Sequence, residues 1–336
     1  MQIGKLPADV LNRLLSKTRP AEGVLIGPAY GEDAAAVRFG GKILVAATDP
    51  ITFTTDRIGH YAVSVNANDI AAHGARPRYF LAMILLPDGA CESDAECVFN
   101  QINESCERIG VALIGGHTEV TQAVDRIVVS GCMLGEVDEG GLVHTAGARV
   151  GDALVLAGGI AIEGTAILAR EAEDELLAKG IAPEVIESAK GLLDNPGICI
   201  LDYAMAATEV GGVTSMHDPT EGGLAAALRE LAAAAGCGLV IDRDAIHILP
   251  ECRAMCDALR LDPLGLIASG SLLIACSPEG AGEILARIQA AGVPASNIGE
   301  VVAAKHGLGF YDGSDLPAFP RDEIARYFDE REKGRK

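Results

Sequence analysis

The sequence has no tryptophan, few other aromatic residues and a shortage of positive charge. Aromatic residues make up 4% of the 336 positions, so the core must be built mainly from aliphatic side chains. Lysine and arginine together number 27 against 47 acidic residues, which gives a net charge of −20. A surface this acidic repels nucleic-acid phosphates and anionic membranes. We therefore expect no nucleic acid and no membrane as partner, whereas a nucleotide accompanied by magnesium is not excluded.

Long apolar runs and paired cysteines are also missing. No stretch approaches the roughly 20 apolar residues that span a bilayer, and the N-terminal residues lack the uninterrupted apolar run of a signal peptide. The nine cysteines are scattered without a CxxC pair, a pattern that does not indicate a disulfide framework. These absences predict a protein of the reducing cytoplasm.

The common nucleotide-binding and hydrolase motifs are absent too. Residues 159–165 have the glycine spacing of a P-loop, but Thr165 stands where that motif needs lysine. GxGxxG, GxSxG and HExxH do not occur. Cys252 and Cys256 lie four residues apart on an expected helix, and without a second pair they indicate core or surface thiols rather than zinc ligands.

Helix and strand patterns alternate along the whole chain. The first half predicts strands at 42–47, 79–86, 111–114 and 126–137, helices at 58–73 and 94–110, and within residues 1–20 a short helix that ends near Pro20. The second half predicts strands at 153–157, 213–216, 239–242, 271–276 and 297–302, helices at 163–173, 197–210, 224–235 and 279–291, and a charged end at 321–336 that frays. The mixture indicates the α/β (α+β) class. Repeated glycines from 140 to 151 place a boundary near 148, which predicts domains 1–148 and 149–336.

Three segments of the first half place carboxylates beside turns. Glu32 and Asp33 lie in a turn-rich loop, Asp49 ends a strand, and Asp69 lies on a helix three residues after Asn66. An acid at a strand end faces the crevice where α/β proteins bind ligands, and magnesium takes carboxylate oxygens together with substrate phosphates. Each segment taken alone is better explained by solvated turn acids, so the composition of these loops leaves the site open.

The order of the motifs is more informative than any one of them. The chain contains, in sequence, Gly31-Glu32-Asp33-Ala34-Ala35, Thr48-Asp49, a segment from Asn66 to Pro77, and Asp218-Pro219-Thr220-Glu221-Gly222-Gly223-Leu224-Ala225. In this order they resemble the PurM-like, or AIR synthase-related, superfamily, which includes aminoimidazole ribonucleotide synthetase, thiamine-monophosphate kinase, selenophosphate synthetase and HypE. The last motif, with residues 241–246, 261–264 and 298–301, is most similar to the HypE family of hydrogenase maturation proteins.

This resemblance implies a PurM-like two-domain fold. In it an N-terminal sheet dimerises into a barrel-like interface, and a mixed α+β domain follows. It also implies bound ATP and magnesium, with a homodimer, a small-molecule or protein-borne substrate and other maturation proteins as partners. The implied metal ligands are Glu32, Asp33, Asp49 and Asp69. The implied nucleotide-binding residues are Gly31, Asn66, Gly115, Gly116, Thr220, Gly222 and Gly223, and the implied catalytic residues are Asp218, His117 and Glu119.

The chain departs from the HypE pattern in three places. His117 stands where several relatives carry an acid, and Glu119 either replaces that ligand or leaves His117 to contact phosphate. Residues 161–165 replace the G-D-H-G turn, where Glu163 either takes a polar role or only begins a helix. The last cysteine is Cys276, on an expected strand, whereas HypE ends in a cysteine that carries a carbamoyl group. We therefore expect no stable carbamoyl adduct on this chain.

The resemblance implies one reaction theme, in which ATP activates a substrate atom by phosphorylation. The sequence is best interpreted as an AIR synthase-related, HypE-like enzyme that activates a substrate oxygen. Two alternatives stay open. One is a small-molecule kinase resembling thiamine-monophosphate kinase, favoured by Ser269-Gly270-Ser271. The other is a nucleotide-binding regulatory dimer without turnover.

Overall fold

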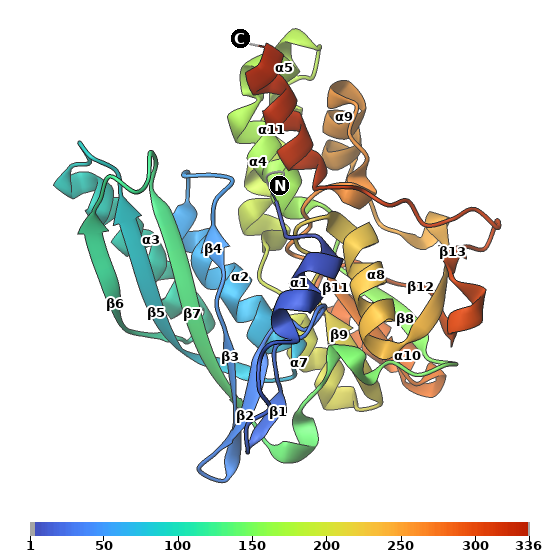
Figure 1. The fold of residues 1–336 in the computed structure, drawn as a ribbon. Coiled ribbons are helices and arrows are strands. Elements are labelled where there is room, and N and C mark those ends of the chain that lie inside the picture. The colour runs from blue at the N-terminus through green and yellow to red at the C-terminus, as the bar shows by residue number, and fades with distance from the viewer. Residues whose placement is uncertain (1–3, 335–336) are drawn as a thin grey trace. The chain divides into compact units, whose positions relative to one another are not determined.

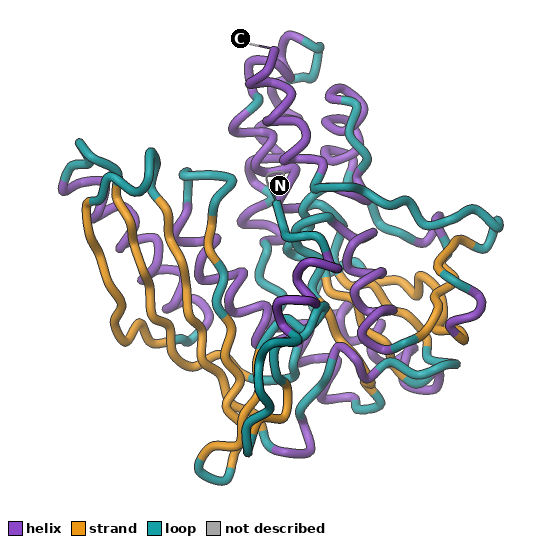
Figure 2. The backbone as a smooth tube through the Cα atoms, viewed as in Figure 1, coloured by secondary structure: helices purple, strands orange, loops and turns teal. Residues whose placement is uncertain are grey.

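The computed structural model describes residues 4–334, which form two compact units (Figures 1 and 2). Unit 1 contains residues 143–334 together with the segments 4–19 and 28–32, and unit 2 contains residues 20–27 and 33–142. The chain therefore changes unit three times before residue 34. The predicted boundary at 148 stays a proposal.

Unit 2 is a sheet with helices on one face (Figure 1). The strands follow the order β1-β2-β3-β7-β5-β6, with β4 beside β7, and β5 and β6 are parallel whereas the other pairs are antiparallel. Its elements are β1 (Val24–Ile26), β2 (Ala35–Phe39), β3 (Lys42–Ala47), β4 (Pro50–Ile51), α2 (Ile58–Ala72), β5 (Arg76–Leu86), α3 (Glu92–Ile109), β6 (Ala112–Val120) and β7 (Val128–Val137).

The two faces of this sheet differ in how they are covered. Every residue of α2 is buried, and the helix contacts α3, β5 and β7. Along β5, Phe80 and Ile84 are buried, whereas Tyr79 and Met83 on the alternate positions are about half exposed. Because alternate residues of a strand point to opposite faces, one face is packed under helices and the other displays apolar side chains.

Unit 1 is built around a second mixed sheet of order β13-β10-β12-β8-β11-β9 (Figure 2). Its strands are β8 (Ala153–Ala157), β9 (Val213–His217), β10 (Cys237–Ile241), β11 (Leu272–Cys276), β12 (Ala295–Ala303) and β13 (Leu308–Phe310). Its helices are α1 (Ala8–Leu15), α4 (Ile162–Glu171), α5 (Glu173–Ala178), α6 (Pro183–Gly191), α7 (Leu201–Val210), α8 (Gly223–Ala235), α9 (Pro250–Leu259), α10 (Pro278–Ala290) and α11 (Glu323–Gly334).

The helix α8 fixes the core of unit 1. Leu224, Leu228 and Leu231 recur at helical spacing and are fully buried against the sheet residues Leu239 and Leu273. Aliphatic burial of this kind is the main favourable term in folding. It holds the first turn of α8 at a fixed place on the sheet, which matters because the predicted phosphate turn precedes this helix.

The mixed α/β fold and its two sheets are confirmed. The short helix expected to end near Pro20 is α1, which ends at Leu15. Two local predictions are wrong. The strand expected at 111–114 continues as β6 to Val120, because it stays paired with β5 through Gly115 and Gly116. The charged end expected to fray forms α11, whose pairs such as Arg326–Glu330 and Lys333–Asp329 lie one helical turn apart; residues 335–336 lie outside the described residues.

Short strands at or next to sheet edges were also missed, namely β1, β2 and β13, as were the helices α5 and α6. Strands of three to five residues carry too little pattern to be recognised from sequence. Among the described helices, none combines the length and the apolar character needed to cross a membrane.

Candidate functional site

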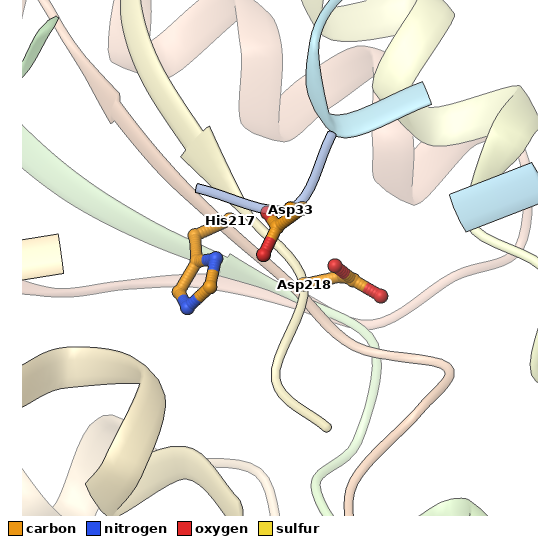
Figure 3. A group of neighbouring side chains, drawn as sticks. All are labelled: Asp33, His217 and Asp218. Carbon is orange, nitrogen blue, oxygen red and sulfur yellow. The ribbon is translucent and has the colours of Figure 1, made fainter. Parts of the chain in front are cut away.

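The turn after β9 carries the predicted catalytic acid. β9 ends at His217, and Asp218 follows it directly (Figure 3). Only 1% of Asp218 is exposed. The chain then turns through Gly222 (φ 89°) and Gly223 (φ 66°) to begin α8. These angles favour glycine, and a Cβ on Gly223 would lie 2.6 Å from the Leu264 carbonyl oxygen. The shape of the turn therefore requires both glycines.

The first turn of α8 contains backbone N–H groups that are not hydrogen-bonded within the described residues. Gly223 donates to the Thr220 carbonyl oxygen (3.0 Å). No acceptor within the described part of the chain takes up the N–H groups of Leu224 and Ala225, although both residues are buried. Helix N-termini attract anions because unpaired N–H groups and the helix dipole both place positive charge there. The turn is thus suited to a phosphate.

Asp322 is a residue of this region that the sequence did not reveal. Its Oδ2 accepts the N–H of Gly222 (2.5 Å), and its Oδ1 accepts the N–H of Ile324 (2.8 Å) at the start of α11. Burial raises the pKa of Asp322 to about 7, against the effect of these N–H donors. An aspartate placed just before a helix is a recognisable capping signal. It was missed because residues 321–336 were expected to fray, so no helix was predicted to begin there.

A buried contact between a histidine and a carboxylate lies beside the turn, within unit 1. His217 Nε2 and Glu230 Oε2 are 3.0 Å apart, which joins the end of β9 to α8. Burial opposes ionisation of Glu230, but the hydrogen bond with His217 and the charge of Lys5 outweigh it and lower its pKa to about 2. Glu230 is therefore charged at neutral pH.

The loop of residues 28–32 is attached to unit 1 by Glu32 and Gly31. Glu32 accepts the N–H groups of Thr145 (Oε2, 3.3 Å) and Ala146 (Oε1, 3.4 Å). Gly31 has φ of 88°, and a Cβ on it would lie 3.0 Å from the carbonyl oxygen of Glu230. The predicted metal ligand Glu32 thus holds its own loop in place. The next residue, Asp33 (labelled in Figure 3), begins unit 2.

In unit 2, Asn66 and Asp49 are brought together through the backbone. The Asp49 N–H donates to Asn66 Oδ1 (2.9 Å), and Asn66 Nδ2 donates to the carbonyl oxygens of Asp49 (3.2 Å) and Ala62 (2.8 Å). Asn66 is fully buried, and Asp69 is 4% exposed. Asn66 therefore fixes the strand end that presents the Asp49 carboxylate, a positioning role that its family motif alone did not specify.

The remaining predicted residues lie on the edge strand β6. His117 Nε2 and Glu119 Oε2 are 3.1 Å apart, on the same face of the strand, and both side chains are exposed. Gly116 has φ of 147°, and a Cβ there would overlap the carbonyl oxygen of Ala82 on β5. Gly115, with φ of 149°, has open space around it. Gly116 is thus required by the pairing of β5 with β6.

The cysteines differ widely in exposure. Cys91 and Cys97 on α3 are exposed, whereas four others are buried: Cys106, Cys252, Cys256 and Cys276. Cys276 is the last residue of β11, and burial raises the pKa of its thiol to about 11. The prediction that Cys252 and Cys256 lie on a helix is confirmed by α9, where their sulfur atoms are 4.0 Å apart.

Known proteins are similar to this chain in sequence and in fold. Residues 31–137 match the N-terminal domain of AIR synthase related proteins, and residues 149–312 match the C-terminal domain. A putative hydrogenase expression/formation protein of Methanocaldococcus jannaschii is 34% identical over 284 residues, 82% of this chain and 80% of the relative. Carbamoyl dehydratase HypE of Rhizobium leguminosarum is 32% identical over 282 residues, 81% of this chain and 77% of the relative.

Solved structures resemble the whole fold. HypE in complex with ATP has a TM-score of 0.71 at 23% identity, covering 94% of this chain and 91% of its own. A HypE–HypF complex gives 0.71 at 22%, covering 85% and 93%. Thiamine monophosphate kinase of Aquifex aeolicus gives 0.67 at 22%, covering 84% and 92%. At these identities the structures show the fold alone, whereas the sequence matches show that the chain belongs to the PurM-like, AIR synthase-related protein family.

Proposed function

We propose that this chain is a HypE-like, magnesium-dependent ATP-binding enzyme that activates a substrate oxygen by phosphorylation. The observation that carries this proposal is the turn from Asp218 to Gly223. There a buried carboxylate is followed by a glycine turn and by two backbone N–H groups without acceptors. A phosphate group accompanied by a hard cation satisfies both features.

The residues of this chain fit magnesium and a nucleotide. In unit 2, Asp33, Asp49 and Asp69 offer carboxylate oxygens, which magnesium prefers, and in unit 1 Asp218 offers them beside the turn that begins α8. When bound, the metal would neutralise charge on the phosphates. The N–H groups at the start of α8 would hold phosphate oxygens, and Gly222 and Gly223 give the backbone the close approach that this needs. Asn66 would keep Asp49 in position, and His117 and Glu119 on β6 are the proposed catalytic residues of unit 2.

The substrate is proposed to be a small molecule or a group carried on a protein. HypE has been solved in complex with the maturation protein HypF, and we extend this kind of partnership to the present chain as a proposal. A free small-molecule acceptor would place the chain in metabolism, whereas a protein-borne acceptor would place it in protein maturation.

A homodimer is proposed as the working form. The uncovered face of the unit 2 sheet displays Tyr79, Met83 and Ile114, each about half exposed. Apolar groups gathered on one face of a sheet favour burial against another protein surface. A second copy of the same chain offers an equivalent surface, so the contact can be isologous.

The test is titration calorimetry of ATP with and without magnesium. Asp218→Asn keeps the size of the side chain and removes its charge, so it should weaken magnesium-dependent ATP binding at least tenfold, about 1.4 kcal/mol. Asp202→Asn, an exposed acid on α7, is the matched control and should bind like the wild type. Equal affinities for all three proteins would contradict the assignment of Asp218, and no ATP binding by the wild type would remove the proposed function.

A small-molecule kinase is the second candidate, because one buried hydroxyl favours it. Ser269 is 1% exposed, and its Oγ has no hydrogen-bond partner in the described structure. The preceding residue, Ala268, donates its N–H to the Thr220 carbonyl oxygen (3.3 Å), which ties this hydroxyl to the phosphate turn. Measuring ADP and AMP release with a panel of small phosphate acceptors, and with carbamoylated protein acceptors, distinguishes the two candidates by which class accelerates ATP consumption.

A further inference from the structure

The residues that precede α1 are seated on the phosphate turn of unit 1. The backbone N–H of Lys5 donates to Glu221 Oε1 (2.8 Å). Gly4 adopts φ of 125°, and a Cβ there would lie 2.7 Å from the same oxygen. The chain therefore passes so close to Glu221 that glycine is favoured at position 4. This seating places the next side chain, Lys5, over the turn.

The ammonium group of Lys5 contacts two residues of the turn region. Lys5 Nζ donates to Thr220 Oγ1 (3.3 Å) and lies 3.7 Å from Glu230 Oε1. The Lys5 side chain is 50% exposed, whereas that of Glu230 is 9% exposed. An anion that approaches from solvent can therefore reach the ammonium, while the carboxylate below it is already engaged by His217.

The negative charge around the turn explains why a lysine ammonium there would favour phosphate binding. Asp218 and Glu230 are buried acids, and Glu221 is a third acid on the same turn. A phosphate entering here meets N–H groups at the start of α8 but also this negative charge. A lysine ammonium is a compact point charge suited to phosphate oxygens. Lys5 contacts Thr220, the residue that the family resemblance assigns to nucleotide binding.

We propose that Lys5 is a phosphate-binding residue of this site, supplied by the segment before α1. The proposal rests on the proposed function, since it requires a phosphate at the Thr220–Gly223 turn. It adds a cation from outside every motif that the sequence resemblance contains. On binding, the ammonium contacts the phosphate in addition to Thr220, and no covalent step is involved.

The test compares Lys5→Met with Lys17→Met by calorimetric titration of magnesium–ATP. Lys17 is an exposed lysine of the same unit, so it controls for the loss of one positive charge. Lys5→Met should weaken ATP binding roughly tenfold, about 1.4 kcal/mol, and Lys17→Met should leave it unchanged. Lys5→Arg should restore most of the affinity, because it keeps the positive charge.

Salt dependence separates phosphate binding from a structural role of Lys5. Loss of a charge contact makes ATP affinity less sensitive to added potassium chloride, so Lys5→Met should show a flatter salt dependence of ATP affinity than the wild type. A weaker affinity with unchanged salt dependence, or an affinity equal to that of Lys17→Met, overturns the proposal while leaving the proposed function standing. Wild-type protein that binds no ATP overturns both.

Discussion

At the scale of single residues, the chain uses buried carboxylates for different purposes. Asp218 is buried directly after β9, beside the turn that begins α8, whereas Asp322 is buried and holds that turn by accepting the Gly222 N–H. Glu230 is kept charged by His217. The sequence motif pointed to Asp218, whose catalytic role stays a prediction. The role of Asp322 depends on a contact across 100 positions of sequence, which no local pattern contains.

The raised pKa of Asp322 predicts how stability changes with pH. Its folded pKa of about 7 lies above the ordinary value of about 3.9. The folded state therefore retains a proton that the unfolded chain loses, so the contribution of Asp322 to stability is fully present below about pH 4 and is lost as pH rises through 7. As the pH rises from about 5 to about 7.5, the titration of Asp322 should lower the free energy of unfolding by roughly 2 kcal/mol.

Urea denaturation at these two pH values measures the effect. Asp322→Asn cannot titrate, so its free energy of unfolding should change less with pH than that of the wild type by this amount. The exposed Asp257→Asn variant should keep the wild-type dependence. Identical pH dependence in all three proteins would mean that Asp322 is ionised throughout the range.

At the scale of elements, long periodic segments were predictable and sheet edges were not. The helices α2, α3, α8 and α10 and the strands β3, β8 and β11 match their predicted positions within a few residues. The helices α3, α8 and α10 carry apolar residues at helical spacing, β3 alternates, and β8 and β11 are short continuous apolar runs. The strand predicted at 111–114 runs on through both glycines as β6. Its extended course depends on pairing with β5, a contact distant in sequence.

The pair Gly115 and Gly116 allows that pairing to be tested. Both have φ near 150°, so alanine is strained at either position, but only at Gly116 would the new Cβ overlap the Ala82 carbonyl oxygen. Gly116→Ala should therefore lower the free energy of unfolding by roughly 2 kcal/mol more than Gly115→Ala does. Equilibrium urea denaturation gives both values. Equal losses would show that backbone strain alone, and not the approach of β5, requires glycine here.

At the scale of the whole molecule, the uncovered sheet face of unit 2 predicts self-association. We expect light scattering to give the mass of a dimer at micromolar concentration, with more than about 1,000 Å² buried. Met83→Lys places a charge in the middle of the face and should shift the protein to monomer, because burying an unpaired charge is costly. Val150→Lys, at an exposed position of unit 1, should remain dimeric. A wild-type monomer would contradict the prediction.

The buried cysteines allow the unfolding of each unit to be followed by alkylation. Without tryptophan, the fluorescence commonly used to follow unfolding is weak, but alkylating reagents reach a buried cysteine only when its surroundings open. Cys106 lies in unit 2, and Cys252, Cys256 and Cys276 lie in unit 1. Peptide mapping after brief alkylation in dilute urea would therefore time the opening of each unit separately. Cys91 and Cys97, exposed from the start, would calibrate the reagent within the same sample.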